Sequence, residues 1–390
     1  MPAIASRVDN IPLSGIREMM NLALTIPDVL RLEIGDPDFM TPEHITAAAT
    51  DWARTNRIGY PPNAGIPELR EAIARKVTST NGIACSAGHV NVTIGATGAL
   101  YLAMLAVLEP GDEVLVPDPG WAGYPAMVAL AGGVFRPYRL DPENGFRMRL
   151  RDVEAAIGRK TRAILLNSPS NPTGAVNDPA DIQALVEMAA DRGIWVISDE
   201  CYDEVVFEGP SACAGTFAAL DGGPVLSAFS FSKTYAMTGW RIGYLVAPAE
   251  ISGHVTRMQA AAVASASVVS QRAALAALDG PQAPCVEMVS AYARRRDLAM
   301  AILDRAGLGY IRPQGALYLF VDIRKAGIGS REFATALLRE RAVCTTPGAA
   351  FGESGDGFVR VSLACSDNDL AEGLTRLVAF ARERSGGRAG

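Results

Sequence analysis

The middle of the chain carries short apolar runs that do not alternate with polar residues. Five of them are VNVTIG (90–95), EVLVP (113–117), AILLNS (163–168), IWVISDE (194–200) and VLSAFS (225–230). Strands that are covered on both faces have this pattern, because neither face meets water. Helical patterns separate the runs. The pattern therefore predicts an α/β fold with a mostly parallel central sheet flanked by helices.

The two ends of the chain differ from this middle part. Residues 1–45 contain glycine and proline around GDPDFMTPEH, which is typical of an arm that crosses a surface. After about residue 275 come a charged helix candidate (VEMVSAYARRRDLAMAIL) and the short strands GALYLFVDI and GFVRVSLA. We predict an N-terminal arm with part of a small domain (1–45), a large domain (46–275) and a smaller α+β domain (276–390).

The last segment of the chain has the pattern of an amphipathic helix. Ser366 and Asp369 resemble a capping box at its start. Apolar residues then follow at helical spacing, namely Leu370, Leu374, Leu377, Val378 and Ala381.

Composition and charge exclude several classes of function. The 390 residues carry a net charge of −6, and the most basic run, Arg294 to Arg296, lies in the charged helix candidate. We interpret that run as a solvated face, without a nucleic-acid partner. The six cysteines are scattered without a CxxC pair, which argues against a metal site and against disulfides. With no apolar targeting segment and no stretch long enough to span a bilayer, we expect a cytoplasmic protein without a membrane partner.

Polar residues follow each apolar run, where open α/β sheets bind ligands. Gly95-Ala96-Thr97-Gly98 leads into a helical run, and such a turn exposes free backbone N–H groups to an anion. Trp121 lies on the loop after the second run. It is either a packing residue or a platform on which a flat ring stacks.

The third and fourth runs end in an amide and a carboxylate. Asn171 stands between Pro169 and Pro172, so either turn chemistry or the need to fix one amide explains the segment. Burying the Asp199 carboxylate at the end of a covered strand costs free energy unless it pairs with a cation or accepts hydrogen bonds. It is either a loop acid or helix cap, or the partner of a protonated ring nitrogen.

The fifth run ends at a lysine between two serines. In a partly desolvated, cation-lined site Lys233 becomes an amine nucleophile that can form a Schiff base. The hydroxyls of Ser230 and Ser232, with Arg241, suit a phosphate dianion. Alone, Lys233 would be read as an exposed loop lysine. Together, the five sites offer partners for one aldehyde, one ring nitrogen, one ring face and one phosphate. These are the parts of pyridoxal 5′-phosphate (PLP).

One segment carries a specific resemblance. SFSKTYAMTGWRIG (230–243) resembles the PLP-lysine signature of the class I/II aminotransferases, the aspartate aminotransferase group of fold-type I PLP-dependent enzymes. Further stretches similar to that family run in its order and cover nearly the whole chain: GDPDF (35–39), GYPPNAGIPELREAIA (59–74), GATGAL (95–100), GWAGYP (120–125), NSPSNPTGAV (167–176), DECY (199–202), GALYLF (315–320) and FVRVSLA (358–364).

The resemblance implies roles around the cofactor ring. Lys233 would hold PLP as a Schiff base and later carry a proton between the substrate Cα and the cofactor. Asp199 would keep the pyridine nitrogen protonated, so that the ring accepts electrons. Asn171 and Tyr202 would hydrogen-bond the phenolate oxygen, and Trp121 would stack on the ring. Trp121 and Asn171 would also contact the substrate.

The resemblance also implies how the phosphate and the substrate are held. The phosphate would be bound by Ala96, Thr97, Ser230, Ser232 and Arg241. Arg360 would clamp the substrate α-carboxylate through a bidentate fork, with the Gly35 backbone nearby. Tyr60 would reach the phosphate of the neighbouring subunit, which implies a homodimer with active sites at its interface.

The implied activity is transfer of an amino group between an L-amino acid and a 2-oxo acid by a ping-pong mechanism. Thr97 offers no positive charge for a second substrate carboxylate. Arg17 and Arg272 are candidate cations, and we interpret both as structural. The apolar segment Ile11 to Ile16 is predicted to form a lid that suits aromatic or aliphatic substrates. Two alternatives stay open: a lyase or synthase of the same fold, such as a carbon–sulfur β-lyase, and a PLP-binding regulator.

Overall fold

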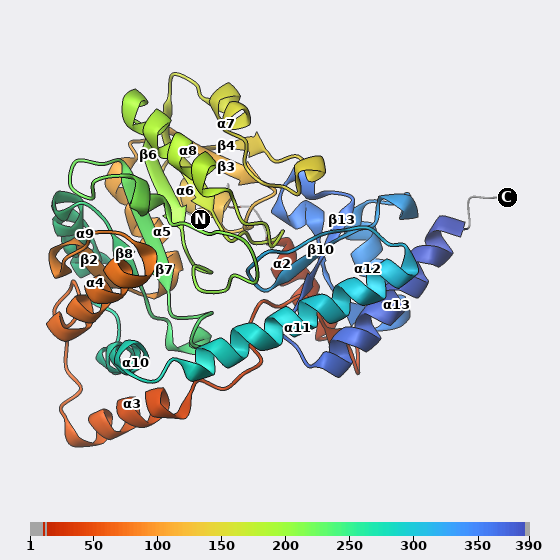
Figure 1. Ribbon diagram of the computed structural model, residues 1–390, viewed down its shortest axis with the longest axis horizontal. Coiled ribbons are helices and arrows are strands. Elements are labelled where there is room, and N and C mark those ends of the chain that lie inside the picture. Colours follow the sequence, from red (N-terminus) through yellow and green to blue (C-terminus); the bar gives the residue numbers. More distant parts are fainter. Residues whose placement is uncertain (1–10, 12–13, 387–390) are drawn as a thin grey trace, which may run out of the picture.

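The computed structural model describes residue 11 and residues 14–386, and its largest sheet has seven strands (Figure 1). Their order is β2-β8-β7-β6-β5-β3-β4. The strands are β2 (Val90–Thr93), β3 (Glu113–Asp118), β4 (Val134–Arg139), β5 (Thr161–Asn167), β6 (Trp195–Asp199), β7 (Val225–Ser230) and β8 (Gly243–Val246). Neighbouring strands from β7 to β4 are parallel, and β8 runs antiparallel to both β2 and β7. The predicted mostly parallel sheet is confirmed, and each of the five apolar runs overlaps one of its strands.

Helices cover both faces of this sheet, which explains why its strands do not alternate. On β6, Val196 packs in one core cluster with Ile182 of helix α8. The next residue, Ile197, packs in a separate cluster with Leu100 of helix α5. The helices of this part are α3 (Glu43–Thr55), α4 (Pro67–Asn81), α5 (Gly95–Val107), α6 (Tyr124–Leu130), α7 (Leu150–Ala156), α8 (Pro179–Arg192), α9 (Ala249–Ala262) and α10 (Val268–Asp279).

The C-terminal third builds a smaller, antiparallel sheet in the order β12-β13-β10-β9. Its strands are β9 (Tyr310–Ile311), β10 (Tyr318–Asp322), β12 (Thr346–Pro347) and β13 (Phe358–Ser362). The helices around it are α2 (Gly15–Ala23), α11 (Ala283–Ala306), α12 (Ser330–Arg341) and α13 (Asp367–Gly386). None of the helices in the described part of the chain is both long and apolar enough to cross a membrane.

The N-terminal segment joins this smaller sheet region. Strand β1 (Leu30–Arg31) pairs in parallel with β11 (Val343–Cys344), and α2 lies beside the smaller sheet (Figure 1). This pairing supports our proposal that residues 1–45 form an N-terminal arm and part of the small domain, with domain boundaries near residues 45 and 275.

The predicted last helix is confirmed as α13. The Asp369 amide donates to the Ser366 hydroxyl at 3.0 Å, so the predicted cap satisfies one of the free N–H groups at the helix start. The apolar residues at helical spacing are all buried.

The interpretation of Arg294 to Arg296 as a solvated face is wrong for two of the three residues. Arg294 is exposed, but Arg295 and Arg296 are buried on helix α11. The Arg295 guanidinium donates two hydrogen bonds of 2.8 Å to the Asp38 carboxylate and one of 2.9 Å to Asp367. Asp38 lies 257 residues earlier in the chain. The pattern of the helix alone could not reveal such a distant partner.

We expect replacement of Arg295 by leucine to lower the free energy of unfolding by about 2 kcal/mol, because Asp38 would lose a buried, bidentate partner. The value is below that of a fully buried pair, because Asp38 and Asp367 are partly exposed. Urea denaturation measures the change. The exposed neighbour variant Arg294→Leu is the matched control and should change stability by less than about 0.5 kcal/mol. Equal losses of stability in the two variants would contradict a stabilising role for the pair between Arg295 and Asp38.

Candidate active site

A cavity of about 860 Å³ lies where the carboxyl ends of β5, β6 and β7 meet the smaller sheet. Twelve of the residues predicted from the sequence line it: Gly35, Ala96, Thr97, Trp121, Asn171, Asp199, Tyr202, Ser230, Ser232, Lys233, Arg241 and Arg360. The thirteenth, Tyr60, is not among the lining residues, and its side chain is 93% exposed.

Lys233 enters the cavity from the turn after β7. Its Nζ donates a hydrogen bond of 2.5 Å to the carbonyl of Gly35, which comes from the N-terminal segment. A Cβ on residue 35 would lie 1.9 Å from the Tyr318 hydroxyl, so only glycine fits there. The amine is thus held at the junction of three distant segments of the chain.

One end of the cavity has the donors that an anion requires. Helix α5 begins at Gly95, and no side chain caps its first N–H groups. Its first turn, with Ala96 and Thr97, lines the cavity together with Arg241. A Cβ on Gly95, whose φ is +71°, would lie 2.9 Å from the Arg241 guanidinium. The missing side chain leaves room for the guanidinium beside the helix start, an arrangement that suits a phosphate.

Asp199 is a buried carboxylate at the end of β6. The Tyr124 hydroxyl donates to it at 2.7 Å and the Cys201 amide at 3.1 Å. Burial raises the pKa of Asp199 to about 6, although both hydrogen bonds lower it. Among the described residues no cation forms an ion pair with this carboxylate. The surroundings fit a cationic partner such as a protonated ring nitrogen.

Arg360 projects from β13 and is buried. Its Nη1 donates to the Asn171 side-chain oxygen at 2.8 Å, and its guanidinium lies 4.2 Å from the centre of the Tyr318 ring. Burial lowers the pKa of Arg360, yet an arginine stays charged in proteins. Its Nε has no hydrogen-bond partner within the described chain. A guanidinium with an unused donor in a cavity suits a carboxylate ligand.

Sequence reasoning missed three residues that shape the site. Tyr124 holds Asp199, Tyr318 forms a 2.8 Å hydrogen bond with the Tyr202 hydroxyl, and Asn167 donates to the Asp199 carbonyl at 3.1 Å. All three lie inside the stretches that resemble the family, GWAGYP, GALYLF and NSPSNPTGAV. Their position in those stretches was the available signal, but their partners are far away in the sequence.

Of the two candidate second cations, the structure brings only Arg17 to the cavity. Arg17 lines it beside Ile11 and Ile16. Arg272 instead pairs with Glu68 at 3.4 Å and lies over the Trp52 ring, outside the cavity lining. Residues 12–13 of the predicted lid lie outside the described residues.

We expect the variant Tyr124→Phe to raise the pKa of Asp199 further, because the hydrogen bond from Tyr124 stabilises the charged carboxylate and a bond of this kind contributes about 1.5–3 kcal/mol. The folded-state pKa of about 6 exceeds the ordinary value of 3.8. The unfolded chain therefore loses its proton first, and this group lowers the stability of the cofactor-free protein as pH rises from about 4 to about 6. In the variant the loss should continue to higher pH. Urea denaturation of cofactor-free protein across this range measures it.

The matched control for that experiment is Tyr138→Phe. Tyr138 is also buried, but its hydroxyl donates to the Leu165 carbonyl at 2.9 Å. This variant should be less stable by about 1 kcal/mol at every pH. Parallel stability curves for Tyr124→Phe and the unmodified protein would refute the role of Tyr124.

Comparisons with known proteins show the family of this chain. The family model for aminotransferase class I and II matches residues 27–377. An aspartate aminotransferase of Pyrococcus abyssi is 36% identical over 98% of this chain and 99% of its own length. An aromatic-amino-acid aminotransferase of Thermococcus litoralis has the same identity and coverage. The solved aspartate aminotransferase of Thermus thermophilus with maleate superposes with a TM-score of 0.93 at 36% identity, covering 97% of this chain and all of that one.

Family membership and the donor set agree on the cofactor. Enzymes of this family use pyridoxal 5′-phosphate, and the cavity offers an amine, a buried carboxylate and an anion-binding helix start. The chain belongs to the class I and II aminotransferases and is a PLP-dependent aminotransferase.

Proposed function

We propose that this cavity transfers an amino group between an L-amino acid and a 2-oxo acid in two half-reactions, by a ping-pong mechanism. The observation that carries the proposal is that the Lys233 amine, the Asp199 carboxylate and the Arg360 guanidinium line one cavity. This reaction needs three groups: an amine that transfers a proton, an anion that pairs with the ring nitrogen, and a cation that binds the substrate carboxylate.

Each part of the cofactor has residues that would hold it. Asp199 would pair with the ring nitrogen, and Trp121 would cover one ring face. Asn171 and Tyr202 would hydrogen-bond the phenolate oxygen. The phosphate would be bound by Ala96, Thr97, Ser230, Ser232 and Arg241. When bound, PLP supplies an aldehyde that condenses with amines and a ring that accepts electrons.

The chain's own residues then orient the substrate and move its proton. The Arg360 fork binds the α-carboxylate, and its hydrogen bond to Asn171 fixes the direction of the guanidinium. A substrate held there presents its Cα–H to one side of the cavity. The Lys233 amine would take that proton from the substrate Cα and would return it from the same side of the cavity, which is general acid-base catalysis by a positioned group. In the cofactor-free protein the Gly35 carbonyl holds the amine in the cavity.

The wall around the substrate side chain favours a dicarboxylate. Arg17 lines the cavity, and its guanidinium forms no ion pair with any described residue. A second carboxylate on the substrate would supply that partner. Ile11, Ile16 and Met20 line the same region and favour, as a second candidate, an aromatic or aliphatic side chain.

We expect Arg17→Gln to lower kcat/KM for aspartate about tenfold, because an exposed charge-assisted contact contributes about 1.4 kcal/mol. Its kcat/KM for phenylalanine should not fall. Arg272→Gln, outside the cavity, is the matched control and should leave both substrates unaffected. If both substrates lost activity equally in Arg17→Gln, a binding role for the guanidinium would be refuted. Much faster single turnover of phenylalanine or leucine than of aspartate by the unmodified enzyme would favour the apolar candidate.

We also propose that the enzyme is a cytoplasmic homodimer. The exposed side chain of Tyr60 is in the position of a residue that reaches a neighbouring subunit's phosphate, and Met40 and Ile58 are exposed apolar residues. The six cysteines form no disulfide, as expected in a reducing compartment. Sedimentation equilibrium tests the dimer, and a monomer at micromolar concentration would exclude it.

The proposed reaction is tested by the absorption spectrum of the PLP-loaded enzyme. A visible chromophore should bleach on addition of an amino acid and return when a 2-oxo acid follows. Release of pyruvate and ammonia without a 2-oxo acid acceptor would instead identify a lyase.

A further inference from the structure

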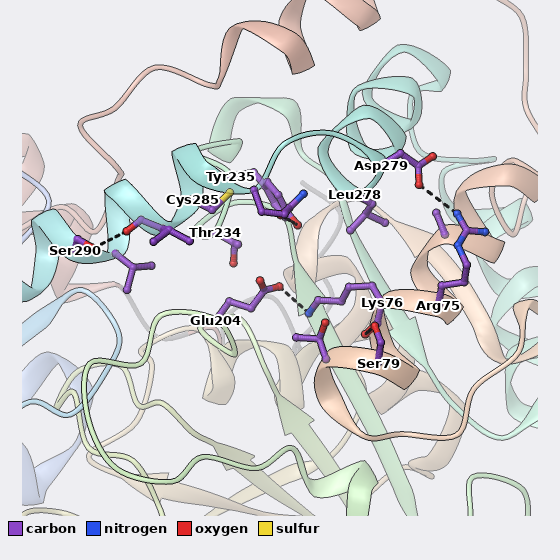
Figure 2. A pocket seen from close by; sticks show the side chains of 15 residues that line it. Arg75, Lys76, Ser79, Glu204, Thr234, Tyr235, Leu278, Asp279, Cys285 and Ser290 are labelled. Carbon is purple, nitrogen blue, oxygen red and sulfur yellow. Dashed lines mark hydrogen bonds and ion pairs between the residues drawn. The ribbon is translucent and has the colours of Figure 1, made fainter.

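A second cavity, of about 460 Å³, lies between α4, α10 and α11 (Figure 2). It shares no lining residue with the active-site cavity. Thr234 and Tyr235 contribute to its wall, and they directly follow Lys233 in the chain. The cavity therefore lies behind the turn that carries the active-site lysine.

The charges at this cavity do not balance. The Lys76 ammonium lies 2.5 Å from the Asp203 carboxylate, 2.9 Å from Glu204 and 2.9 Å from the Asn81 side-chain oxygen. These three acceptors use all three N–H donors of the lysine. The other ion pair at the wall, Arg75 with Asp279, is neutral by itself. Two carboxylates thus share one ammonium, and one negative charge remains at the cavity.

Glu204 is the carboxylate that faces the cavity. It lines the wall, whereas the Asp203 side chain is only 3% exposed and does not. Burial, and then the charge of Asp203, raise the pKa of Glu204, although Lys76 lowers it. Figure 2 shows the Glu204 carboxylate with one dashed contact to Lys76 and its remaining side toward the open space.

A second, independent feature points to a ligand. Thr234 is 2% exposed, and its hydroxyl has no hydrogen-bond partner within the described chain. Its side chain points into the cavity on the side of Glu204 (Figure 2). A buried hydroxyl without a partner costs about 1–3 kcal/mol, so a ligand that satisfies it is favoured.

Part of the wall is apolar, beside polar residues such as Ser79, Thr80, Gln282 and Ser290. Three apolar residues line it, Leu278 of α10 and Val286 and Val289 of α11. An inorganic cation would leave this surface unused, whereas an organic ligand buries it.

We propose that this cavity binds a small organic cation with N–H donors and an apolar body. Its donors reach the free side of the Glu204 carboxylate and the Thr234 hydroxyl, and its body lies on Leu278, Val286 and Val289. A ligand in this place contacts the turn that carries Lys233. The site is distinct from the one at which the amino group is transferred.

The test is titration calorimetry of the PLP-loaded enzyme with benzamidinium chloride. This probe has a planar cationic group with N–H donors on an apolar ring, and it is not a primary amine that condenses with the cofactor. Benzamide is the matched neutral probe. We expect saturable binding of one benzamidinium per chain, at least tenfold tighter than benzamide. No saturable binding, or equal affinities for the two probes, would overturn the proposal.

Three variants locate the bound probe. Glu204→Gln keeps the shape and the oxygen that faces Lys76, and should weaken benzamidinium at least tenfold. Thr234→Val should weaken it severalfold. Val286→Trp fills the cavity from a position that is 63% exposed, so its fold should be retained and binding lost. Unchanged affinity in Glu204→Gln and Val286→Trp would place the probe elsewhere, including in the active site, and would overturn the proposal.

Discussion

Replacing Lys233 by alanine is expected to lower turnover by about 10⁴-fold or more, because the same side chain is assigned two tasks. It attaches the cofactor, and it carries the substrate proton. The chain has four lysines, at positions 76, 160, 233 and 325, and Lys233 alone among them lines the active-site cavity. No other amine is in place to substitute for it.

The variant separates attachment from turnover. Borohydride reduction followed by mass spectrometry should find the cofactor covalently bound to the Lys233 peptide in the unmodified enzyme, and no such peptide adduct in Lys233→Ala. Lys325→Ala, at an exposed lysine far from the cavity lining, is the control and should keep both the adduct and the activity. Covalent cofactor and full turnover in Lys233→Ala would refute the central assignment.

Asp199→Asn is expected to lower kcat/KM by about 10³-fold, which corresponds to about 4 kcal/mol. Asparagine keeps the shape of the side chain, and its amide oxygen can still accept the hydrogen bond from Tyr124. The negative charge is removed, and the oxygen that accepts from the Cys201 amide is replaced by an NH₂ group. Without that charge a protonated ring nitrogen would lie in a buried site with no counterion, and the ring would accept electrons less readily. Steady-state kinetics with saturating PLP measures the loss.

The chain offers a matched control one residue away. Glu200 is also buried, and burial raises the pKa of its carboxyl to about 7, while hydrogen bonds from Ser198 and the Ala214 amide lower it. Glu200 does not line the cavity. Glu200→Gln should therefore keep kcat/KM within about threefold, with any change appearing in stability. If the two variants lost activity equally, a charge partnership between Asp199 and the cofactor would not explain the loss.

Much of the candidate site could be predicted from the sequence because of a property of parallel sheets. The carboxyl ends of β5, β6 and β7 lie at the same edge of the large sheet. The polar residues at these strand ends are therefore brought together for any conformation of the connecting loops. Asn171 and Lys233 follow β5 and β7, Asp199 is the last residue of β6, and all three line the cavity. The strands themselves could be predicted because an apolar run is a local feature of the sequence.

Residues whose environment depends on distant segments could not be predicted in this way. Arg295 was predicted to be solvated because its own helix is charged, yet it is buried and pairs with Asp38 and Asp367. Arg17 and Arg272 were equivalent as candidate cations until the fold placed one inside the cavity and the other over Trp52.

The sequence by itself determined the α/β class, the family and the identity of the reactive groups, because these depend on local periodicity and on contiguous motifs. The tertiary structure alone decided that Tyr124 supports Asp199, that Tyr318 meets Tyr202, and that Glu204 and Thr234 face a second cavity behind Lys233. The two contacts join residues 75 and 116 positions apart. Glu204 and Thr234 come from two turns that are 30 residues apart in the sequence. Burial and electrostatic partners are properties of the packed chain, and no pattern along the chain encodes them directly.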